Sequence, residues 1–251
     1  MAAPVELRLD VSTASPEGGT HHNAAWLFAP PPEKLRHPAI AIIAVPGGGY
    51  SKAYYHMSIP GHPGYSFAEH MVSLGYIVVA MDHLGVGEST RLDDGDLLDL
   101  DVMAAAGHIA ARQIRAGLAS GALSEHLPPL PEIRLVGMGH SMGGGVTVTQ
   151  QASHESFDAL AVIGYTFVHA KDIQHDLDDP SNLSEEALRA RVIANVQKLV
   201  GARWDDVYFK VERAKVHAWF HWPDVPDEVI AADDAAATTT PRMAAVDTQS
   251  P

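Results

Sequence analysis

The chain has 251 residues, of which 46% are hydrophobic, and this is enough to bury a substantial core. Its 17 Lys and Arg against 31 Asp and Glu give a formal net charge of -14, which repels nucleic acid and anionic membranes, so neither is expected as a partner. The absence of cysteine excludes disulfides, thiolate metal sites and cysteine nucleophiles. Charged residues between Met1 and Ser12 argue against a signal peptide, and no apolar run is long enough to span a bilayer, so a cytoplasmic location is expected.

Apolar patterning in the N-terminal part of the chain predicts strands and a helix. Val5 to Val11 alternates apolar and polar side chains, and Ala24 to Phe28 follows a glycine turn, so these two segments are predicted to form an opening hairpin. Ala39 to Val45 and Tyr76 to Met81 are apolar runs, which are typical of strands buried on both faces. Between them, Ser66 to Leu74 has apolar residues at helical spacing.

The central part continues this alternation. The predicted helices are Asp99 to Leu118 and Gly143 to Ala152. The predicted strands are Ile133 to Met138 and Ala159 to Tyr165. Strands that alternate with helices pair in parallel through right-handed crossovers. The sequence therefore predicts an α/β fold with a doubly wound, mostly parallel sheet.

The pattern changes after the last of these strands. His169 to Asp179 is acidic and polar, and Ser184 to Val200 predicts a helix that its first serine can cap. Trp204 to Trp222 is rich in aromatic residues, and Asp227 to Ala237 predicts a short helix. From Ala235 onward Ala, Thr and Pro dominate without periodicity, which is typical of a flexible tail or an interrupted linker.

The segment Gly139-His140-Ser141-Met142-Gly143 lies between a predicted strand and a predicted helix. A serine flanked by glycines in a strand-to-helix turn is the context of a nucleophile elbow. The tight turn requires small residues on both sides of Ser141 and presents its hydroxyl beside a helix N-terminus. The alternative, an ordinary serine in a glycine-rich turn, is weaker because both flanking elements are predicted.

On these residues the chain resembles the α/β-hydrolase superfamily, over about Val5 to Val168. The resemblance implies a cofactor-independent serine hydrolase that cleaves an ester or related acyl bond through an acyl-enzyme at Ser141. Together with the patterns above, it divides the chain into a hydrolase core at residues 1–168, a helical lid at residues 169–234 and a tail or linker at residues 235–251.

Two further motifs are similar to this family. Val45-Pro46-Gly47-Gly48-Gly49-Tyr50 stands where the family has its His-Gly-Gly oxyanion loop, with Pro46 in place of the usual histidine. The resemblance implies that the amides of Gly48 and Met142 form the oxyanion hole. Asp82-His83-Leu84-Gly85-Val86-Gly87-Glu88-Ser89 is similar to the family's structural Asp-x-x-Gly-x-Gly-x-Ser turn, and it lacks the Gly-x-Gly-x-x-Gly pattern of a dinucleotide-binding loop.

The acid and the base of a triad are not identified by the sequence. A serine hydroxyl needs a histidine to take its proton and a carboxylate to orient that histidine. In the family both follow later strands, and no strand is predicted after Tyr165. We therefore expect that the chain stops before these strands, as a truncated product or one half of a split enzyme, and that it is a poor catalyst alone. Asp172 is a candidate acid, although a solvated residue in an acidic loop is the favoured interpretation.

The histidines that follow Ser141 are interpreted as lid, helix or pocket residues rather than as the base: His154, His169, His175, His217 and His221. His217 and His221 have the spacing of metal ligands on a helix. The glutamate of the metalloprotease motif and a clear third ligand are missing, so no metal site is predicted.

The aromatic residues between Trp204 and Trp222 favour an apolar lid wall and a small hydrophobic acyl substrate. The fold hosts many chemistries, so the identity of the substrate stays open. The competing interpretation is a catalytically inactive fragment or binding module that retains the pocket. A complementing second chain, or a homo-oligomer, would restore a complete triad.

Overall fold

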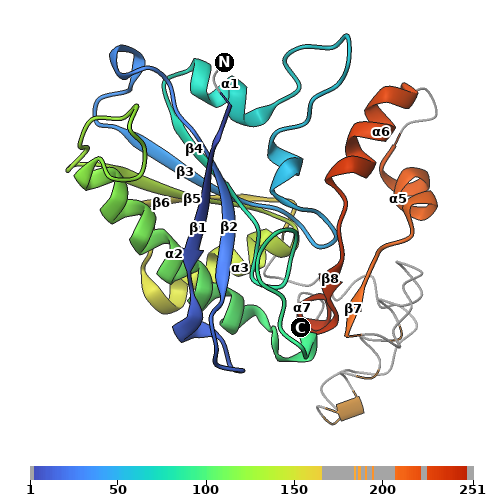
Figure 1. Cartoon of the computed structure of the whole chain (residues 1–251). Helices are drawn as coiled ribbons and strands as arrows, with labels where there is room; N and C mark the ends of the chain where they lie inside the picture. Colours follow the sequence, from blue (N-terminus) through green and yellow to red (C-terminus); the bar gives the residue numbers. More distant parts are fainter. Residues whose placement is uncertain are drawn as a thin grey trace.

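The computed structural model describes residues 3–165, 184, 186–187, 190, 194, 207–221 and 225–247. The strands of its main sheet are β1 (Val5–Asp10), β2 (His22–Phe28), β3 (Ile40–Val45), β4 (Ile77–Met81), β5 (Arg134–His140) and β6 (Ala159–Ile163). They form a six-stranded sheet in the order β1-β2-β4-β3-β5-β6 (Figure 1). β1 and β2 form the predicted antiparallel hairpin, β2 is antiparallel to β4, and the other neighbouring pairs are parallel.

The register of the parallel strands brings their carboxyl ends to one edge of the sheet. Ala44 of β3 pairs with Ala80 of β4, and Val45 of β3 pairs with Gly139 of β5. The loop after β3 and the turns after β4 and β5 therefore meet at this edge. In open α/β sheets, ligands bind outside the carboxyl ends of the strands.

Helices cover both faces of the sheet. They are α1 (Phe67–Ser73), α2 (Leu100–Ser120) and α3 (Met142–His154), with short 3-10 helices at η1 (Ser12–Ala14), η2 (Pro32–Lys34), η3 (Lys52–Tyr55) and η4 (Gly95–Leu97). Successive side chains of β3 point to opposite faces: Ile43 packs in a core cluster with α2 and α3, and Ile42 packs in a second cluster with α1. The predicted doubly wound, mostly parallel α/β sheet is confirmed.

The helices begin and end where their capping signals predict. The Ser66 hydroxyl accepts a hydrogen bond from the amide of Glu69 at 3.1 Å, and the Asp99 carboxylate accepts one from the amide of Val102 at 2.8 Å. Both bonds satisfy amides that have no partner inside the helix. Helix α2 ends at Gly121, whose φ of 77° lies in the left-handed region that glycine adopts without strain.

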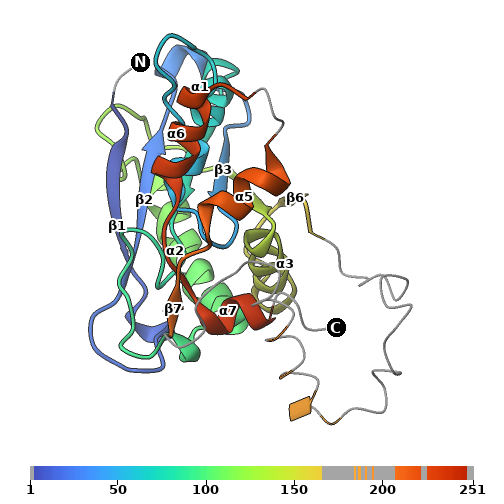
Figure 2. The ribbon, with the colours of Figure 1, turned by 90° about the vertical axis from the view of Figure 1, so that its right-hand side faces the viewer.

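The C-terminal elements lie along one side of the core, as Figures 1 and 2 show. They are β7 (Tyr208–Phe209), α5 (Arg213–Phe220), α6 (Asp227–Ala236), β8 (Thr240–Pro241) and α7 (Arg242–Asp247), with β7 antiparallel to β8. Residues 237–247 lie in the segment that the sequence predicts to be a flexible tail or an interrupted linker, and they include β8 and α7. The amide of Thr238 donates to the carbonyl of Gly49 at 2.8 Å, and Ala237 forms a β-bridge with Tyr50. Contact with the loop after β3 orders a segment that has no periodic pattern of its own.

Two predicted segments lie wholly or largely outside the described residues. They are the acidic stretch at residues 169–179 and the helix at residues 184–200. At the start of that helix, the Ser184 hydroxyl accepts a hydrogen bond from the amide of Ala187 at 3.2 Å, as a cap should. The division into core, lid and tail stays a prediction.

Strand β6 pairs only with β5 within the described part of the chain. All of its side chains are apolar, and Leu160 and Ile163 are 37% and 46% exposed. By contrast, every residue of β4 is buried. An edge strand that carries neither a proline nor a charged residue is a surface on which further strands can pair.

Candidate functional site

Ser141 lies at the turn between β5 and α3, with its side chain exposed. Its backbone has φ 51° and ψ -122°, a conformation that residues with a side chain rarely adopt. The turn is held by the amide of Ser141, which donates to the carbonyl of Ile163 at 2.9 Å, and by the amide of Gly144, which donates to the carbonyl of Ser141 at 2.8 Å. This is the strained strand-to-helix geometry of a nucleophile elbow.

The two glycines of the elbow are required by close backbone approach. A methyl group on Gly139 would overlap the carbonyl oxygen of Gly143. A methyl group on Gly143 would lie 2.5 Å from the carbonyl oxygens of Val45 and Pro46. Helix α3 can therefore approach the ends of β3 and β5 only because both residues lack a side chain.

Gly139→Ala is expected to lower the free energy of unfolding by about 3 kcal/mol or more, because the added methyl meets backbone that cannot move without displacing α3. Gly48→Ala is the matched control, since its methyl would sit 3.6 Å from the flexible Met142 Sδ. We expect the control to change stability by less than about 1 kcal/mol. Urea unfolding followed by circular dichroism measures both, and equal midpoints would contradict the packing argument.

The glycine loop after β3 lies directly against the elbow. A Cβ atom on Gly47 would be 3.2 Å from Cβ of Ser141, and one on Gly48 would be 3.9 Å from Cβ of Met142. The amide of Met142 is the first in α3, where no intrahelical acceptor exists. Among the residues that the structure describes, the amides of Gly48 and Met142 donate to no other group. These two amides lie beside Ser141 and remain the candidates for an oxyanion hole.

The turn after β4 supports this loop from inside the protein. Nε2 of the buried His83 lies 2.9 Å from the carbonyl oxygen of Pro46. The buried Asp82 carboxylate accepts hydrogen bonds from the amide of Lys52 at 2.5 Å and from its Nζ at 2.9 Å. Glu88 pairs with the same Nζ at 2.5 Å. The turn at Asp82 to Ser89, which the sequence predicts to have a structural role, thus bonds to residues at both ends of the glycine loop.

His83 also makes the stability of the protein depend on pH. Burial lowers the pKa of His83 below its ordinary 6.5, although the hydrogen bond to Pro46 and the charge of Asp82 act in the opposite direction. Between that lowered value and 6.5, the unfolded chain binds more protons at this position than the folded chain. Stability contributed by neutral His83 is therefore present above 6.5 and is lost as the pH falls toward the folded pKa.

We expect the free energy of unfolding to fall as the pH drops below 6.5 toward the lowered pKa of His83, and His83→Gln to reduce this dependence because glutamine does not titrate. Urea unfolding at several pH values measures the slope. His21→Gln is the control, because it makes the same substitution at a second buried histidine. A slope that is identical in wild type and His83→Gln would contradict the prediction.

Aromatic rings link the elbow to the C-terminal helices. His140 stacks on Tyr54 with ring centroids 5.4 Å apart, and Tyr54 contacts Tyr50 at 5.2 Å. Burial lowers the pKa of His140, so its ring is neutral at pH 7, and burial raises the pKa of Tyr50 and of Tyr54, so both phenols keep their protons. None of these rings carries charge at the site.

Tyr50 joins a cluster of charged groups on α5 and α6. Its hydroxyl lies 3.2 Å from Asp233 and 3.3 Å from Arg213. Arg213 pairs with both Asp233 and Asp234, and His217 Nε2 lies 2.9 Å from Asp234. Burial alone would raise the pKa of Asp234, but hydrogen bonds from Arg213 and His217 outweigh it and lower that pKa. The cluster fastens both helices to the residue that follows the glycine loop.

The sequence offers no third metal ligand beside His217 and His221, but the structure brings two carboxylates close to His217. The guanidinium of Arg213, however, occupies the space between these groups. Ligand atoms of His217, Asp233 and Asp234 lie within 4.8 Å of one another. The guanidinium of Arg213 bonds to both carboxylates, and His221 lies 3.6 Å from Asp233. A metal ion would have to displace Arg213, so the geometry favours an ion-pair network.

No described histidine forms a hydrogen bond with the Ser141 hydroxyl. His154 stacks on His108, and His217 and His221 face the acidic pair of α6. His169, His175 and the candidate acid Asp172 lie outside the described residues.

Sequence reasoning missed the residues that brace the site. Lys52 has no motif around it, and Arg213 and Asp233 lie in segments interpreted as lid. Tyr208, assigned to the lid wall, instead packs beside the core, where its hydroxyl bonds to the amide of Leu92 at 3.1 Å. One feature of the sequence could have pointed to these supporting residues. Pro46 replaces the histidine that is usual in the family, so another group has to support the glycine loop.

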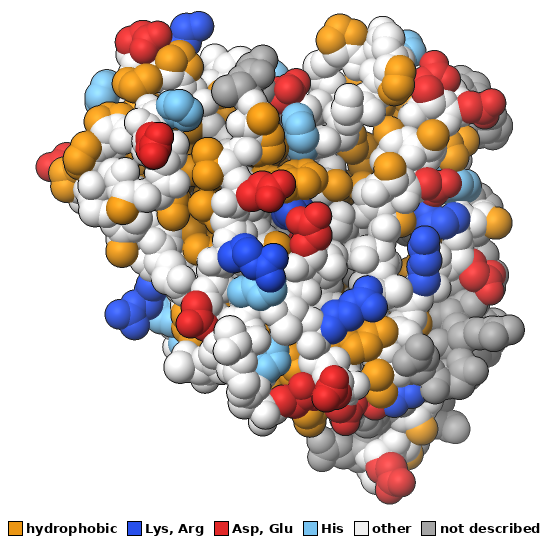
Figure 3. Space-filling model, in the orientation of Figure 1, with side chains coloured by type: hydrophobic (Ala, Val, Ile, Leu, Met, Phe, Trp, Pro, Cys, Tyr) orange, Lys and Arg blue, Asp and Glu red, His pale blue; other side chains and the backbone are white. Residues whose placement is uncertain are grey.

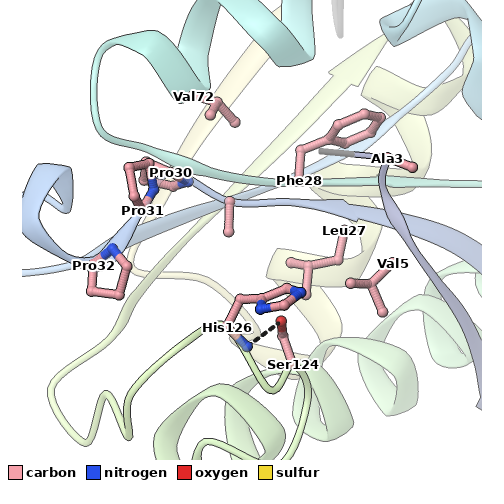
Figure 4. Close-up of a pocket in the computed structure, with 11 residues that line it drawn as sticks. Ala3, Val5, Leu27, Phe28, Pro30, Pro31, Pro32, Val72, Ser124 and His126 are labelled. Carbon is pink, nitrogen blue, oxygen red and sulfur yellow. Dashed lines mark hydrogen bonds between the residues drawn. The ribbon is translucent and has the colours of Figure 1, made fainter. Parts of the chain in front are cut away.

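A separate cavity of about 440 Å³ lies at the opposite end of the sheet (Figure 4). It is lined mainly by apolar residues, among them Val5, Leu27, Phe28 and Pro30. Its polar pair is Ser124 and His126, joined by a hydrogen bond from the His126 amide to the Ser124 hydroxyl at 3.3 Å. Phe28 pairs with Val78 near the start of β4, so this cavity is remote from the elbow.

On the face drawn in Figure 3, basic side chains lie among acidic ones and form no continuous positive track. The formal net charge of -14 agrees with this distribution. In the described part of the chain, no helix combines the length and apolarity that crossing a membrane requires.

Comparison with known proteins gives similarity in structure only. No protein-family model and no curated protein matches the sequence. A "probable hydrolytic enzyme" from Pseudomonas aeruginosa PAO1 matches with a TM-score of 0.56 and 15% identity, over 98% of this chain and 64% of that one. An esterase from Exiguobacterium antarcticum matches with a TM-score of 0.52 and 12% identity, over 98% and 72%. An alpha/beta hydrolase from Penicillium sp. sh18 matches with a TM-score of 0.53 and 14% identity, over 100% and 74%.

This chain thus spans less than two thirds of the length of the Pseudomonas protein. The shared features are the mostly parallel sheet and the helices on both of its faces. Together with the turn geometry at Ser141, they show that the chain has the fold of the α/β-hydrolase superfamily.

Proposed function

We propose that the protein is a serine hydrolase that cleaves an ester or related acyl bond through an acyl-enzyme at Ser141. The observation that carries the proposal is the strained backbone of Ser141, at φ 51°, beside the glycine loop. Solved structures of the same fold include a probable hydrolytic enzyme and an esterase, which supports hydrolysis as the reaction class.

In the proposed reaction, Oγ of Ser141 attacks the acyl carbon while its proton passes to a base. The carbonyl oxygen becomes an oxyanion, to which the amides of Gly48 and Met142 donate hydrogen bonds. The C–O bond to the leaving alcohol then breaks, and the alcohol takes up the proton. Water attacks the acyl-enzyme in the same way and releases the acid with Ser141 restored.

We propose that the base and the acid of this reaction lie outside the described residues, because no described histidine forms a hydrogen bond with the Ser141 hydroxyl. His169 and Asp172 are the candidates on this chain, and a complementing chain or a second copy is the other source. The proposal places no metal ion at the acidic cluster, because Arg213 bonds to both of its carboxylates. The proposed substrate is a small hydrophobic acyl compound, because Tyr54, Met142 and Val211 lie around the glycine loop.

A fluorophosphonate probe tests the proposal, because it reacts with activated serine nucleophiles. We expect intact-mass and peptide analysis to find one label, on Ser141, and short-chain aryl esters to be hydrolysed. Ser120→Ala is the matched control, because Ser120 is an exposed serine at the end of α2. Absence of any label on Ser141 would overturn the proposal. A chain with neither label nor turnover would support the alternative, a binding module that retains the pocket.

A further inference from the structure

The Pro46 carbonyl receives its support from a histidine that lies far from it in the sequence. His83 follows β4 directly, is 3% exposed, and places Nε2 at 2.9 Å from that oxygen. A carbonyl oxygen can only accept, so Nε2 of His83 carries the proton and donates. A buried hydrogen bond of this kind has no competition from water.

The sequence of the loop that follows Pro46 does little to restrict its backbone conformation. Three successive glycines, at positions 47–49, restrict the backbone less than any other residues would. The Pro46 carbonyl belongs to the peptide group that joins Pro46 to Gly47. A bond that orients this peptide therefore sets the direction in which the chain enters Gly48.

The far end of the loop is held by the neighbouring residue of the same turn. The amide of Lys52 donates to Asp82 at 2.5 Å, so Asp82 and His83 restrain positions on either side of the glycines. From the outer side, the amide of Ser51 donates to the carbonyl of Ala236 at 2.9 Å. The loop is therefore restrained along its length, and the His83 bond acts nearest to Gly48.

We propose that His83 is a positioning residue for the oxyanion loop: its Nε2–H fixes the Pro46 peptide and thereby keeps the Gly48 amide aimed at the space beside Ser141. This inference rests on the proposed function for its effect on catalysis. Its effect on the loop is independent of any reaction. His83 touches no substrate in this role and acts only through the backbone of residues 46–48.

Two substitutions separate the hydrogen bond from the packing. His83→Gln keeps an N–H donor near the position of Nε2, whereas His83→Leu keeps the approximate volume and removes the donor. His21→Leu is the matched control, because it makes the same change at another buried histidine, whose Nε2 lies 3.5 Å from the Ser15 hydroxyl. Thermal unfolding of each variant checks that it is folded, and His83→Asn, whose amide is too short to reach Pro46, replaces His83→Leu if that variant does not fold.

The first measurement is hydrogen exchange, followed by mass spectrometry, of a peptide that covers residues 46–52. The amides of Tyr50, Ser51 and Lys52 are hydrogen-bonded in the native loop and report its opening. We expect exchange about tenfold faster in His83→Leu and unchanged in His83→Gln and His21→Leu. Equal exchange in His83→Leu and wild type would overturn the proposal, as would equal acceleration in the leucine and glutamine variants.

The second measurement is ester turnover. We expect kcat to fall about tenfold to a hundredfold in His83→Leu with KM changed by less than about threefold, because the loss falls on the transition state. His83→Gln should retain kcat within about threefold. A general structural defect would instead lower the amount of active protein in proportion to unfolding. If wild type shows no Ser141-dependent turnover, the proposed function fails, and hydrogen exchange still decides the role of His83 in the loop.

Discussion

Ser141→Ala is expected to abolish the Ser141-dependent hydrolysis of a short-chain aryl ester and to leave only the residual rate that oxyanion donors and binding support. Loss of the serine costs about 10⁶-fold in kcat where a triad is complete, and less here if the wild-type rate is limited by the base, but oxyanion donors alone cannot form an acyl-enzyme. The measurement is the initial rate of ester cleavage at saturating substrate. Ser120→Ala, far from the elbow, should keep the wild-type rate. Turnover in Ser141→Ala equal to that of wild type would assign the reaction to another group.

Ser141→Gly provides a second readout that does not depend on turnover. The backbone of Ser141, with φ 51° and ψ -122°, is strained for any residue with a Cβ atom. We expect Ser141→Gly to be about 1 kcal/mol more stable than Ser141→Ala, because glycine adopts this conformation without strain. Urea unfolding compares the two variants. A less stable glycine variant would mean that the turn is not strained at this position.

Asp82→Asn is expected to cause the largest loss of stability among single substitutions near the site. The Asp82 carboxylate is fully buried and pairs with Nζ of Lys52, which is itself 3% exposed. Breaking a buried ion pair leaves a charge without compensation and costs about 3–5 kcal/mol. The amide of asparagine would also oppose donors at Lys52 and Glu88. Urea unfolding should show a correspondingly lower midpoint.

Glu88→Gln is the matched control for this ion pair. Glu88 contacts the same Nζ of Lys52, but its side chain is 68% exposed. Exposed pairs contribute about 0–1 kcal/mol, so the control should unfold close to wild type. If Asp82→Asn and Glu88→Gln lowered the free energy of unfolding equally, burial would not determine how much each ion pair with Lys52 contributes to stability. The comparison also tests the support of the glycine loop at Lys52.

The amino-acid sequence by itself determined the core and the elbow, because both depend on local pattern. Apolar runs marked the buried strands, and β3 and β4 formed within one residue of the predicted bounds. Side-chain caps marked the helix starts at Ser66 and Asp99. The spacing of Gly139, Ser141 and Gly143 marked the strand-to-helix turn. Each signal acts over a few residues, so its physical cause is visible in the sequence.

Only the tertiary structure decided which distant groups support the site. The hydrogen bond from Tyr50 to Asp233 joins residues 183 positions apart, and the bond from His83 to Pro46 spans 37 positions. No periodicity predicts such pairs, since they follow from strand register and from the packing of α5 and α6. Residues 237–247 are ordered for the same reason: their partners are the backbone of the glycine loop and of β7, not one another. The local sequence determines whether a segment prefers a helix or a strand. Where a segment has no such preference, as at residues 237–247, long-range contacts determine whether it becomes ordered.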